Sequence, residues 1–177
     1  VMLASRYVST TGFGRIKPSS DTIRAILTAI QDRQALFVRY VSRNGKEPEW
    51  RAVSPHALVD VVGRYHARCF DHRNGRYGDF VLTRILGSTV DRSDTPDYVD
   101  GFLDKDWSRI VELEVSLKDG EAPLVGRLDY GLEETGSRII RIRKALTPYI
   151  INHRYQGFED PVEIHEVATR RAEFPTR

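Results

Sequence analysis

The segment RYHARCFD, residues 64–71, carries several side chains able to bind an anion at alternating positions. Alternate side chains of an extended strand point to the same face, so Arg64, His66 and Arg68 would lie together. Such donors must meet water, acidic side chains or an anion. Two guanidinium groups and an imidazole suit phosphate, which the arginine fork binds in bidentate fashion. The pattern is therefore consistent with a phosphate-binding strand face.

A solvated outer face is the alternative interpretation of the same strand. Its basic side chains would then form scattered salt bridges to Asp71 or Asp79. Aromatic residues favour the ligand interpretation, because Tyr65 on the opposite face, or Tyr77 at the next turn, could stack a base. The residues alone leave both interpretations open.

A second basic stretch occupies residues 138–144, where Arg141 and Arg143 alternate with isoleucines. Residues 136–155 carry a net charge of +5, whereas residues 91–135 carry −8. A basic strand face of this kind is consistent with a ligand groove or a dimer channel. Pairing with the acidic segment of the same chain is the other possibility.

Signatures of enzymes and metal sites do not occur in the sequence. It contains no phosphate-binding loop, no glycine-rich dinucleotide motif, no nucleophile elbow, and no histidines at metal-ligand spacing. Aspartates recur every three residues at 91, 94, 97 and 100, but a calcium loop also needs a glycine and a closing glutamate. Cys69 stands within a strand, as a small core residue would. We expect no catalytic residue, no metal and no cofactor, and a hydrolase without a known signature stays as a remote alternative.

The elements that would position these side chains begin with a helix over residues 19–33, where Ile23, Ile26, Leu27 and Ile30 form one apolar stripe. Five short strands follow within residues 36–90, at 36–42, 49–55, 56–62, 64–71 and 79–86. Asn44-Gly45 and Asn74-Gly75 supply turn signals. This meander predicts a small SH3-like or Sm-like barrel.

The rest of the chain predicts an acidic linker over residues 91–107 and a smaller α+β unit over 108–177. Strands are expected at 110–117, 138–143 and 162–167, and helices at 121–131 and 144–154. With residues 1–35 as an N-terminal helical segment, the fold class is mixed β and α+β. A chain of 177 residues with 40% hydrophobic and 29% charged residues fits a globular protein, and no apolar run reaches the ~20 residues of a membrane span.

Residues 36–85 resemble the WYL domain of bacterial transcriptional regulators. Tyr40-Val41-Ser42 matches the first-strand motif, and Arg51 through Pro55 matches an R-x-x-x-P motif. Arg64, Tyr65 and His66 occupy the place of the Trp-Tyr-Leu triplet, and residues 79–85 match the closing F-x-L-x-R-I strand. The variants R-Y-H-x-R and D-F-V-L-T-R are similar to one branch, the repressors of phage-defence operons associated with CBASS and BREX.

In that branch, the resemblance implies an N-terminal winged helix-turn-helix, a WYL domain and a C-terminal extension called WCX. Residues 108–177 would be the extension, and RLDYGL at 127–132 fits its "DYGM"-like motif, while the winged helix is missing from this chain. Two departures concern the site. Only Tyr65 of the name-giving triplet is retained, and Gly78 stands where the family usually has an arginine, which Arg76 would replace from the turn.

The resemblance implies a sensor of nucleic-acid-derived ligands. It assigns Arg68 and Arg84 to anion contact and Ser42, Tyr65 and His66 to orienting hydrogen bonds, with Arg76 as the substitute charge. We expect a cytoplasmic, ligand-sensing and dimerising module of a repressor, without membrane contact. Its expected partners are a second copy, a nucleotide or single-stranded nucleic acid, and operator DNA bound through the missing domain. A stand-alone Sm-like RNA-binding protein is the alternative.

Overall fold

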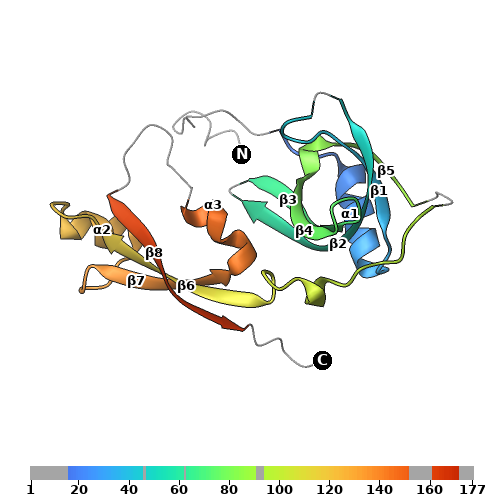
Figure 1. Ribbon diagram of the computed structural model, residues 1–177. Helices are drawn as coiled ribbons and strands as arrows, with labels where there is room; N and C mark the ends of the chain where they lie inside the picture. Colours follow the sequence, from blue (N-terminus) through green and yellow to red (C-terminus); the bar gives the residue numbers. More distant parts are fainter. Residues whose placement is uncertain (1–15, 46, 62, 91–93, 152–160, 172–177) are drawn as a thin grey trace, which may run out of the picture.

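The computed structural model describes residues 16–45, 47–61, 63–90, 94–151 and 161–171. It contains two lobes, each built around its own antiparallel sheet, and residues 94–108 run from one lobe to the other (Figure 1). Among these residues, no helix is long and apolar enough to cross a membrane. The division of the chain into residues 1–35, 36–90, 91–107 and 108–177 stays a prediction.

The first lobe begins with the predicted helix, α1 (Ser20–Gln31). Ser19 caps it, because its hydroxyl accepts a hydrogen bond from the backbone N–H of Thr22 at 3.1 Å. The buried face differs in part from the predicted stripe. Ile26 is fully buried as predicted, but Leu27 is 46% exposed. Ala29, which was not part of the predicted stripe, is buried in the core.

Five strands form the sheet of the first lobe, in the order β4-β3-β2-β1-β5. They are β1 (Leu36–Tyr40), β2 (Glu49–Val61), β3 (Arg64–Asp71), β4 (Arg76–Val81) and β5 (Ile85–Thr89). The strands of this sheet and α1 lie together in one lobe (Figure 1). The core is made by α1 and the inward-facing side chains of the sheet. The core includes Val38, Val53, Ala67, Cys69 and Phe80.

Two predicted strand boundaries are wrong. Residues 49–55 and 56–62 were expected as two strands, but β2 is continuous. Its pairing with β3 shifts register between Pro55 and Ala57, which is typical of a β-bulge. Residues 79–86 were expected as one strand, but a 3₁₀ turn at Leu82–Arg84 divides them between β4 and β5.

The two predicted turns also differ from each other. Gly75 has a φ of 63° and closes the β3–β4 hairpin as expected. Gly45 does not have a positive φ, and it lies in a longer loop between β1 and β2. Its N–H donates to the carbonyl of Ser42 at 3.1 Å, and a side chain at Gly45 would collide with the Ser42 hydroxyl.

The second lobe has a three-stranded antiparallel sheet in the order β7-β6-β8. Its elements are β6 (Arg109–Leu117), α2 (Pro123–Tyr130), β7 (Ser137–Arg143), α3 (Thr147–Ile151) and β8 (Val162–Arg171). Pro148 lies in the first turn of α3, where proline is tolerated. Residues 152–154 of that predicted helix lie outside the described residues. The two lobes together confirm the predicted fold class.

Candidate functional site

The outer face of β3 does not face solvent, because the linker and α3 cover it. Arg68 and His66 are 7% and 3% exposed, and both lie on the face opposite the core residues Ala67 and Cys69. The ring of Tyr149, on α3, lies 5.1 Å from the ring of His66. The alternation predicted for this strand is therefore present, but the surface that it forms is an internal contact.

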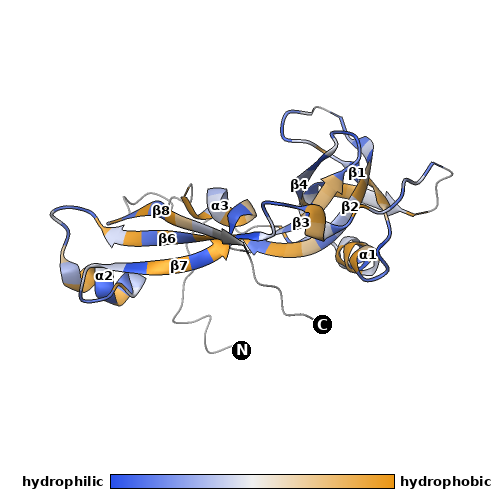
Figure 2. Ribbon diagram, turned by 60° about the horizontal axis from the view of Figure 1, so that its bottom comes forward, coloured by the Kyte–Doolittle hydropathy of each residue, from blue (hydrophilic) through white to orange (hydrophobic). Residues whose placement is uncertain are grey.

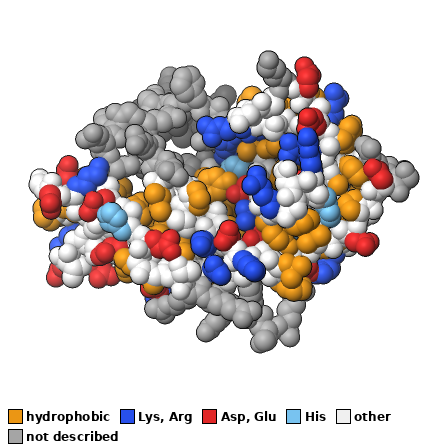
Figure 3. Space-filling model, in the orientation of Figure 1, with side chains coloured by type: hydrophobic (Ala, Val, Ile, Leu, Met, Phe, Trp, Pro, Cys, Tyr) orange, Lys and Arg blue, Asp and Glu red, His pale blue; other side chains and the backbone are white. Residues whose placement is uncertain are grey.

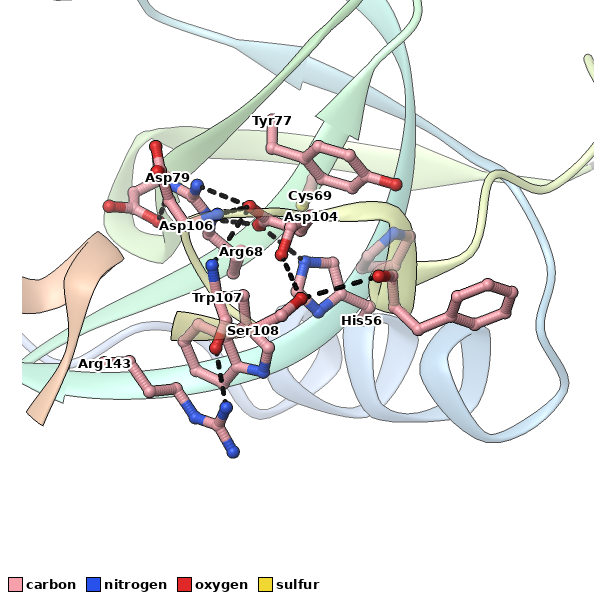
Figure 4. A network of polar contacts seen from close by, with 12 residues as sticks. His56, Arg68, Cys69, Tyr77, Asp79, Asp104, Asp106, Trp107, Ser108 and Arg143 are labelled. Carbon is pink, nitrogen blue, oxygen red and sulfur yellow. Dashed lines mark hydrogen bonds and ion pairs between the residues drawn. The ribbon is translucent and has the colours of Figure 1, made fainter. Parts of the chain in front are cut away.

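Arg68 is the centre of a buried ion-pair network (Figure 4). Its Nε donates to Asp104 Oδ2 at 2.7 Å, and its Nη2 donates to Asp104 Oδ1 at 3.2 Å. Its Nη1 donates to Asp79 Oδ1 at 3.2 Å. The guanidinium fork is thus occupied by two carboxylates of the same chain, which differs from the predicted contact with an external anion.

Hydrogen bonding controls the charge state of this network. Burial acts to raise the pKa of Asp104, but hydrogen bonds from His56 and Arg68 and the charge of Arg68 outweigh it. The pKa of Asp104 consequently falls well below its usual range. Burial acts to lower the pKa of Arg68, and the bond to Asp104 together with the charge of Asp79 reverses this, so that pKa is raised. Both groups are charged at neutral pH.

The network joins the two lobes, since its carboxylates also hold neighbouring elements. The Tyr149 hydroxyl of α3 donates to Asp79 Oδ2 at 2.7 Å, and the Tyr77 hydroxyl of β4 donates to the carbonyl of Asp100 in the linker. Burial is the largest cause that raises the pKa of Tyr77 to about 12, with Asp104 and Asp100 adding to it. Tyr77 is therefore a neutral donor within the junction.

The second basic stretch pairs with the acidic segment. Arg141 Nε donates to Glu112 Oε1 at 2.9 Å, and Arg143 Nη1 donates to the carbonyl of Trp107 at 2.7 Å. The guanidinium of Arg143 also lies 4.5 Å from the centre of the Trp107 ring. The predicted alternative of pairing within the chain is what the structure shows for both arginines.

A polar pocket of about 170 Å³ opens on the core face of the five-stranded sheet, and we call it the Arg51 pocket. Residues of four strands and the β3–β4 turn line it: Tyr40, Arg51, Asp71, Asn74, Arg76, Tyr77, Gly78, Asp79 and Phe80. A Cβ placed on Gly78 would have no atom within 4 Å. The side chain that the family usually places there would therefore occupy open space at this pocket.

Arg51 is an arginine with incomplete hydrogen bonding. Its side chain is 15% exposed, and its Nη1 donates to Asp71 Oδ2 at 3.3 Å. Asp71 also accepts from the N–H of Arg73 and from Asn74 Nδ2, so it serves the hairpin turn as well. The Nε of Arg51 is buried and has no hydrogen-bond partner. A buried guanidinium donor without a hydrogen-bond partner costs free energy.

The predicted site residues form two groups. Arg76 lines the Arg51 pocket, whereas Ser42 and Arg84 are not among its lining residues. The backbone places Arg84 beside the end of β1, because the N–H of Val41 donates to the carbonyl of Arg84 at 3.0 Å. Tyr65 packs against the core cluster, whereas His66 and Arg68 lie on the outer face. Among the described residues, the guanidinium groups of Arg76 and Arg84 have no ion pair. Figure 3 shows basic side chains gathered over this lobe and the junction.

Arg51 itself was missed as a site residue, although a signal for it existed. The R-x-x-x-P match at residues 51–55 marks this arginine, and its position on β2 places it on the same face as core residue Val53. An arginine at an inward-facing strand position needs a partner inside the fold. Within the described ranges, no group of three or more His, Cys, Asp or Glu side chains could hold a metal ion.

Comparison with known families identifies the first lobe. Residues 21–90 match the WYL domain. The predicted resemblance is confirmed, and the match covers α1 together with all five strands of the first sheet. The Arg51 pocket and the Arg68 network therefore both involve strands of the WYL domain.

Curated relatives extend the similarity into the second lobe. The chain is 34% identical over 137 residues to the DNA-binding transcriptional repressor CapW of Stenotrophomonas maltophilia, covering 76% of this chain and 45% of that protein. It is 32% identical over 141 residues to CapW of Pseudomonas aeruginosa, covering 75% and 44%. The chain thus spans less than half the length of these relatives.

Among solved structures, the chain is similar to the proteasome accessory factor B/C (PafBC) of Arthrobacter aurescens. The TM-score is 0.42 at 20% sequence identity, and the match covers 78% of this chain and 24% of that one.

Proposed function

We propose that this chain is the ligand-sensing and dimerising module of a transcriptional repressor. The relatives named CapW are DNA-binding transcriptional repressors, and they are more than twice as long as the part matched here. DNA binding would reside in a winged helix-turn-helix domain outside these 177 residues. The module itself would perform no bond chemistry, in keeping with relatives that are named as repressors rather than enzymes.

The ligand would be a nucleotide or a short single-stranded nucleic acid, bound through phosphate at the Arg51 pocket. The observation that carries this proposal is the buried, unpartnered Nε of Arg51 beside the open space at Gly78. Arg76 lines the same pocket and would supply a second cation. Ser42, which follows β1, and Arg84, in the 3₁₀ turn after β4, would contact the parts of the ligand that extend beyond the pocket. Asp71, shared between Arg51 and the hairpin turn, neutralises one of these charges.

A ligand at this pocket would also act on the second lobe. Tyr77 and Asp79 belong to the pocket lining, and their hydroxyl and carboxylate groups contact the linker and α3. A ligand that displaces β4 would therefore act on the contacts that hold the two lobes together. Coupling of this kind requires different affinities of the ligand for two arrangements of the module.

Titration of nucleotides and short single-stranded oligonucleotides against the chain, at two salt concentrations, tests this proposal. Charge-assisted hydrogen bonds contribute roughly 1.5–3 kcal/mol each, so Arg76→Ala and Arg84→Ala should each weaken binding about ten- to a hundredfold. Binding should also weaken steeply as salt rises, because phosphate contacts release counterions. Arg109→Ala, at an exposed arginine on β6, is the matched control.

Equal affinities of all three variants and the unaltered chain would overturn the assignment of the pocket. Melting curves of each variant separate lost contacts from lost folding. The predicted alternative, an Sm-like RNA-binding protein, would instead give tight RNA binding by a ring-shaped assembly rather than a dimer.

A further inference from the structure

A second and larger cavity, of about 340 Å³, lies between the two lobes, and we call it the interlobe pocket. The end of β2 forms one wall, and the second sheet together with α3 forms the other. Aliphatic side chains dominate both walls, including Val59, Val61, Ile140, Ile142, Val162 and Ile164. Figure 2 shows the hydrophobic positions along β7 and β8. The volume lies in the range of small-molecule sites, and such sites are mostly apolar with a few placed polar groups.

The interlobe pocket has one cationic lining residue, Arg138, and its guanidinium is hydrogen-bonded to the backbone. Arg138 lines the pocket, and its Nη1 donates to the carbonyl of Tyr130 at 3.0 Å. Gly131 follows Tyr130 in a left-handed conformation with a φ of 61°. A Cβ on Gly131 would lie 2.9 Å from Arg138 Nη1, the far end of a flexible side chain. The contact that positions Arg138 is therefore its hydrogen bond to the Tyr130 carbonyl.

Arg138 has donors left for a ligand. A guanidinium carries five N–H donors, and the Tyr130 carbonyl accepts from one nitrogen only. Among the described residues, no carboxylate pairs with Arg138. The other charged lining residue, Asp60, already accepts a hydrogen bond at 2.7 Å from the N–H of Gly63, which closes the β2–β3 turn. The pocket thus offers an apolar body and an available cation.

We propose that the interlobe pocket binds a small aliphatic carboxylate, with its chain between the lobes and its head group on Arg138. The site is separate from the Arg51 pocket, and it does not depend on the function proposed for that pocket. Because its walls belong to both lobes, an occupant would stabilise their arrangement. The ligand would therefore raise the melting temperature, and the increase would grow with the logarithm of the ligand concentration once that concentration exceeds Kd.

The test compares octanoate, octanol and octylamine by calorimetric titration and thermal melting of the chain. Octanoate should bind most tightly, and its affinity should rise up to about fourfold for each further buried methylene in the hexanoate-to-octanoate series. Arg138→Gln, which keeps a donor for the Tyr130 carbonyl, should weaken octanoate about tenfold and leave octanol unchanged. Arg141→Gln, on the opposite face of β7, is the control for a lost positive charge.

Filling the cavity gives a second, independent measurement. Ile142→Phe places a larger side chain at the pocket wall and should abolish octanoate binding, whereas Ile139→Phe, on the same strand but 47% exposed, should not. Equal binding of octanoate and octanol, tighter binding of octylamine, or unchanged binding by Ile142→Phe would overturn the proposal. Arg76→Ala and Arg84→Ala should retain octanoate binding. A negative result for octanoate is therefore distinguishable from a negative result for the anion proposed at the Arg51 pocket.

Discussion

Replacement of Asp104 by asparagine should loosen the junction between the two lobes. Asp104 is 2% exposed, and both its oxygens accept hydrogen bonds. Oδ2 accepts from Arg68 Nε at 2.7 Å and contacts His56 Nε2 at 3.3 Å. Oδ1 accepts from Arg68 Nη2 and from the backbone N–H groups of Asp106 and Trp107. An asparagine has one acceptor oxygen, so its amide group must face one of these donors.

The cost follows from what the substitution leaves behind. Removing one partner of a buried ion pair costs about 3–5 kcal/mol, because the remaining charge is no longer compensated. Arg68 would keep its bond to Asp79 at 3.2 Å, so the lower end, about 3 kcal/mol, is expected for Asp104→Asn. For a chain of this length, each kcal/mol shifts the melting temperature by about 2–4 °C. The expected decrease is therefore about 6–12 °C.

Thermal unfolding followed by circular dichroism measures this decrease. The matched control is Asp106→Asn, an exposed aspartate two residues away, which should change stability by less than about 0.5 kcal/mol. A double-mutant cycle with Arg68→Met should show that the two substitutions are not additive. An Asp104→Asn variant that melts within about 1 °C of the unaltered chain would refute the role assigned to this network.

Three further predictions concern pH, the cysteine and assembly. Because the folded-state pKa of Asp104 is depressed, its stabilisation is fully present above the unfolded value of about 3.9 and is lost as the pH falls below it. The difference in melting temperature between the unaltered chain and Asp104→Asn should hence shrink below about pH 4, and a constant difference down to pH 2 would contradict this. Burial is the largest cause that raises the pKa of Cys69 well above its usual value, so a thiol reagent should label it only as the chain unfolds. Labelling at the rate of a free thiol in the folded chain would show the side chain to be accessible. Sedimentation at tens of micromolar should show a homodimer, and a 20.3 kDa species alone would count against the proposed dimerising role.

Periodicity was sufficient to predict most elements of the fold, because each sheet buries one face. The alternation Val111, Leu113, Val115 predicted β6, and the first two of these side chains are fully buried. Strand ends were less predictable, since a bulge or a 3₁₀ turn leaves little trace in the hydrophobic pattern. Leu82 shows this clearly, because it is buried in the core although it begins the 3₁₀ turn that ends the β4 strand.

The site was harder to predict than the fold, because the outcome depended on residues far away in sequence. The alternation of His66 and Arg68 correctly placed them on one face, but it could not reveal that Asp104, 36 residues after Arg68, would cover that face. The sequence predicted residues 91–107 only as an acidic linker, yet one of its carboxylates, that of Asp104, is among the most buried groups of the described residues. Arg51 was hidden for a similar reason, since the unpartnered state of its Nε depends on the packing of neighbouring strands.

The central claim, that an anion binds at Arg51, can be measured at the atom concerned. Nitrogen-15 NMR of arginine side chains reports the Nε–H group of Arg51, which has no hydrogen-bond partner among the described residues. Stepwise addition of a nucleotide monophosphate should shift this resonance saturably, while the resonance of Arg109 stays in place as an internal control. The Arg51 resonance must be assigned by its loss in Arg51→Lys. Saturable binding that leaves the Arg51 resonance unmoved would contradict the account, as would the absence of binding by nucleotides and short oligonucleotides alike.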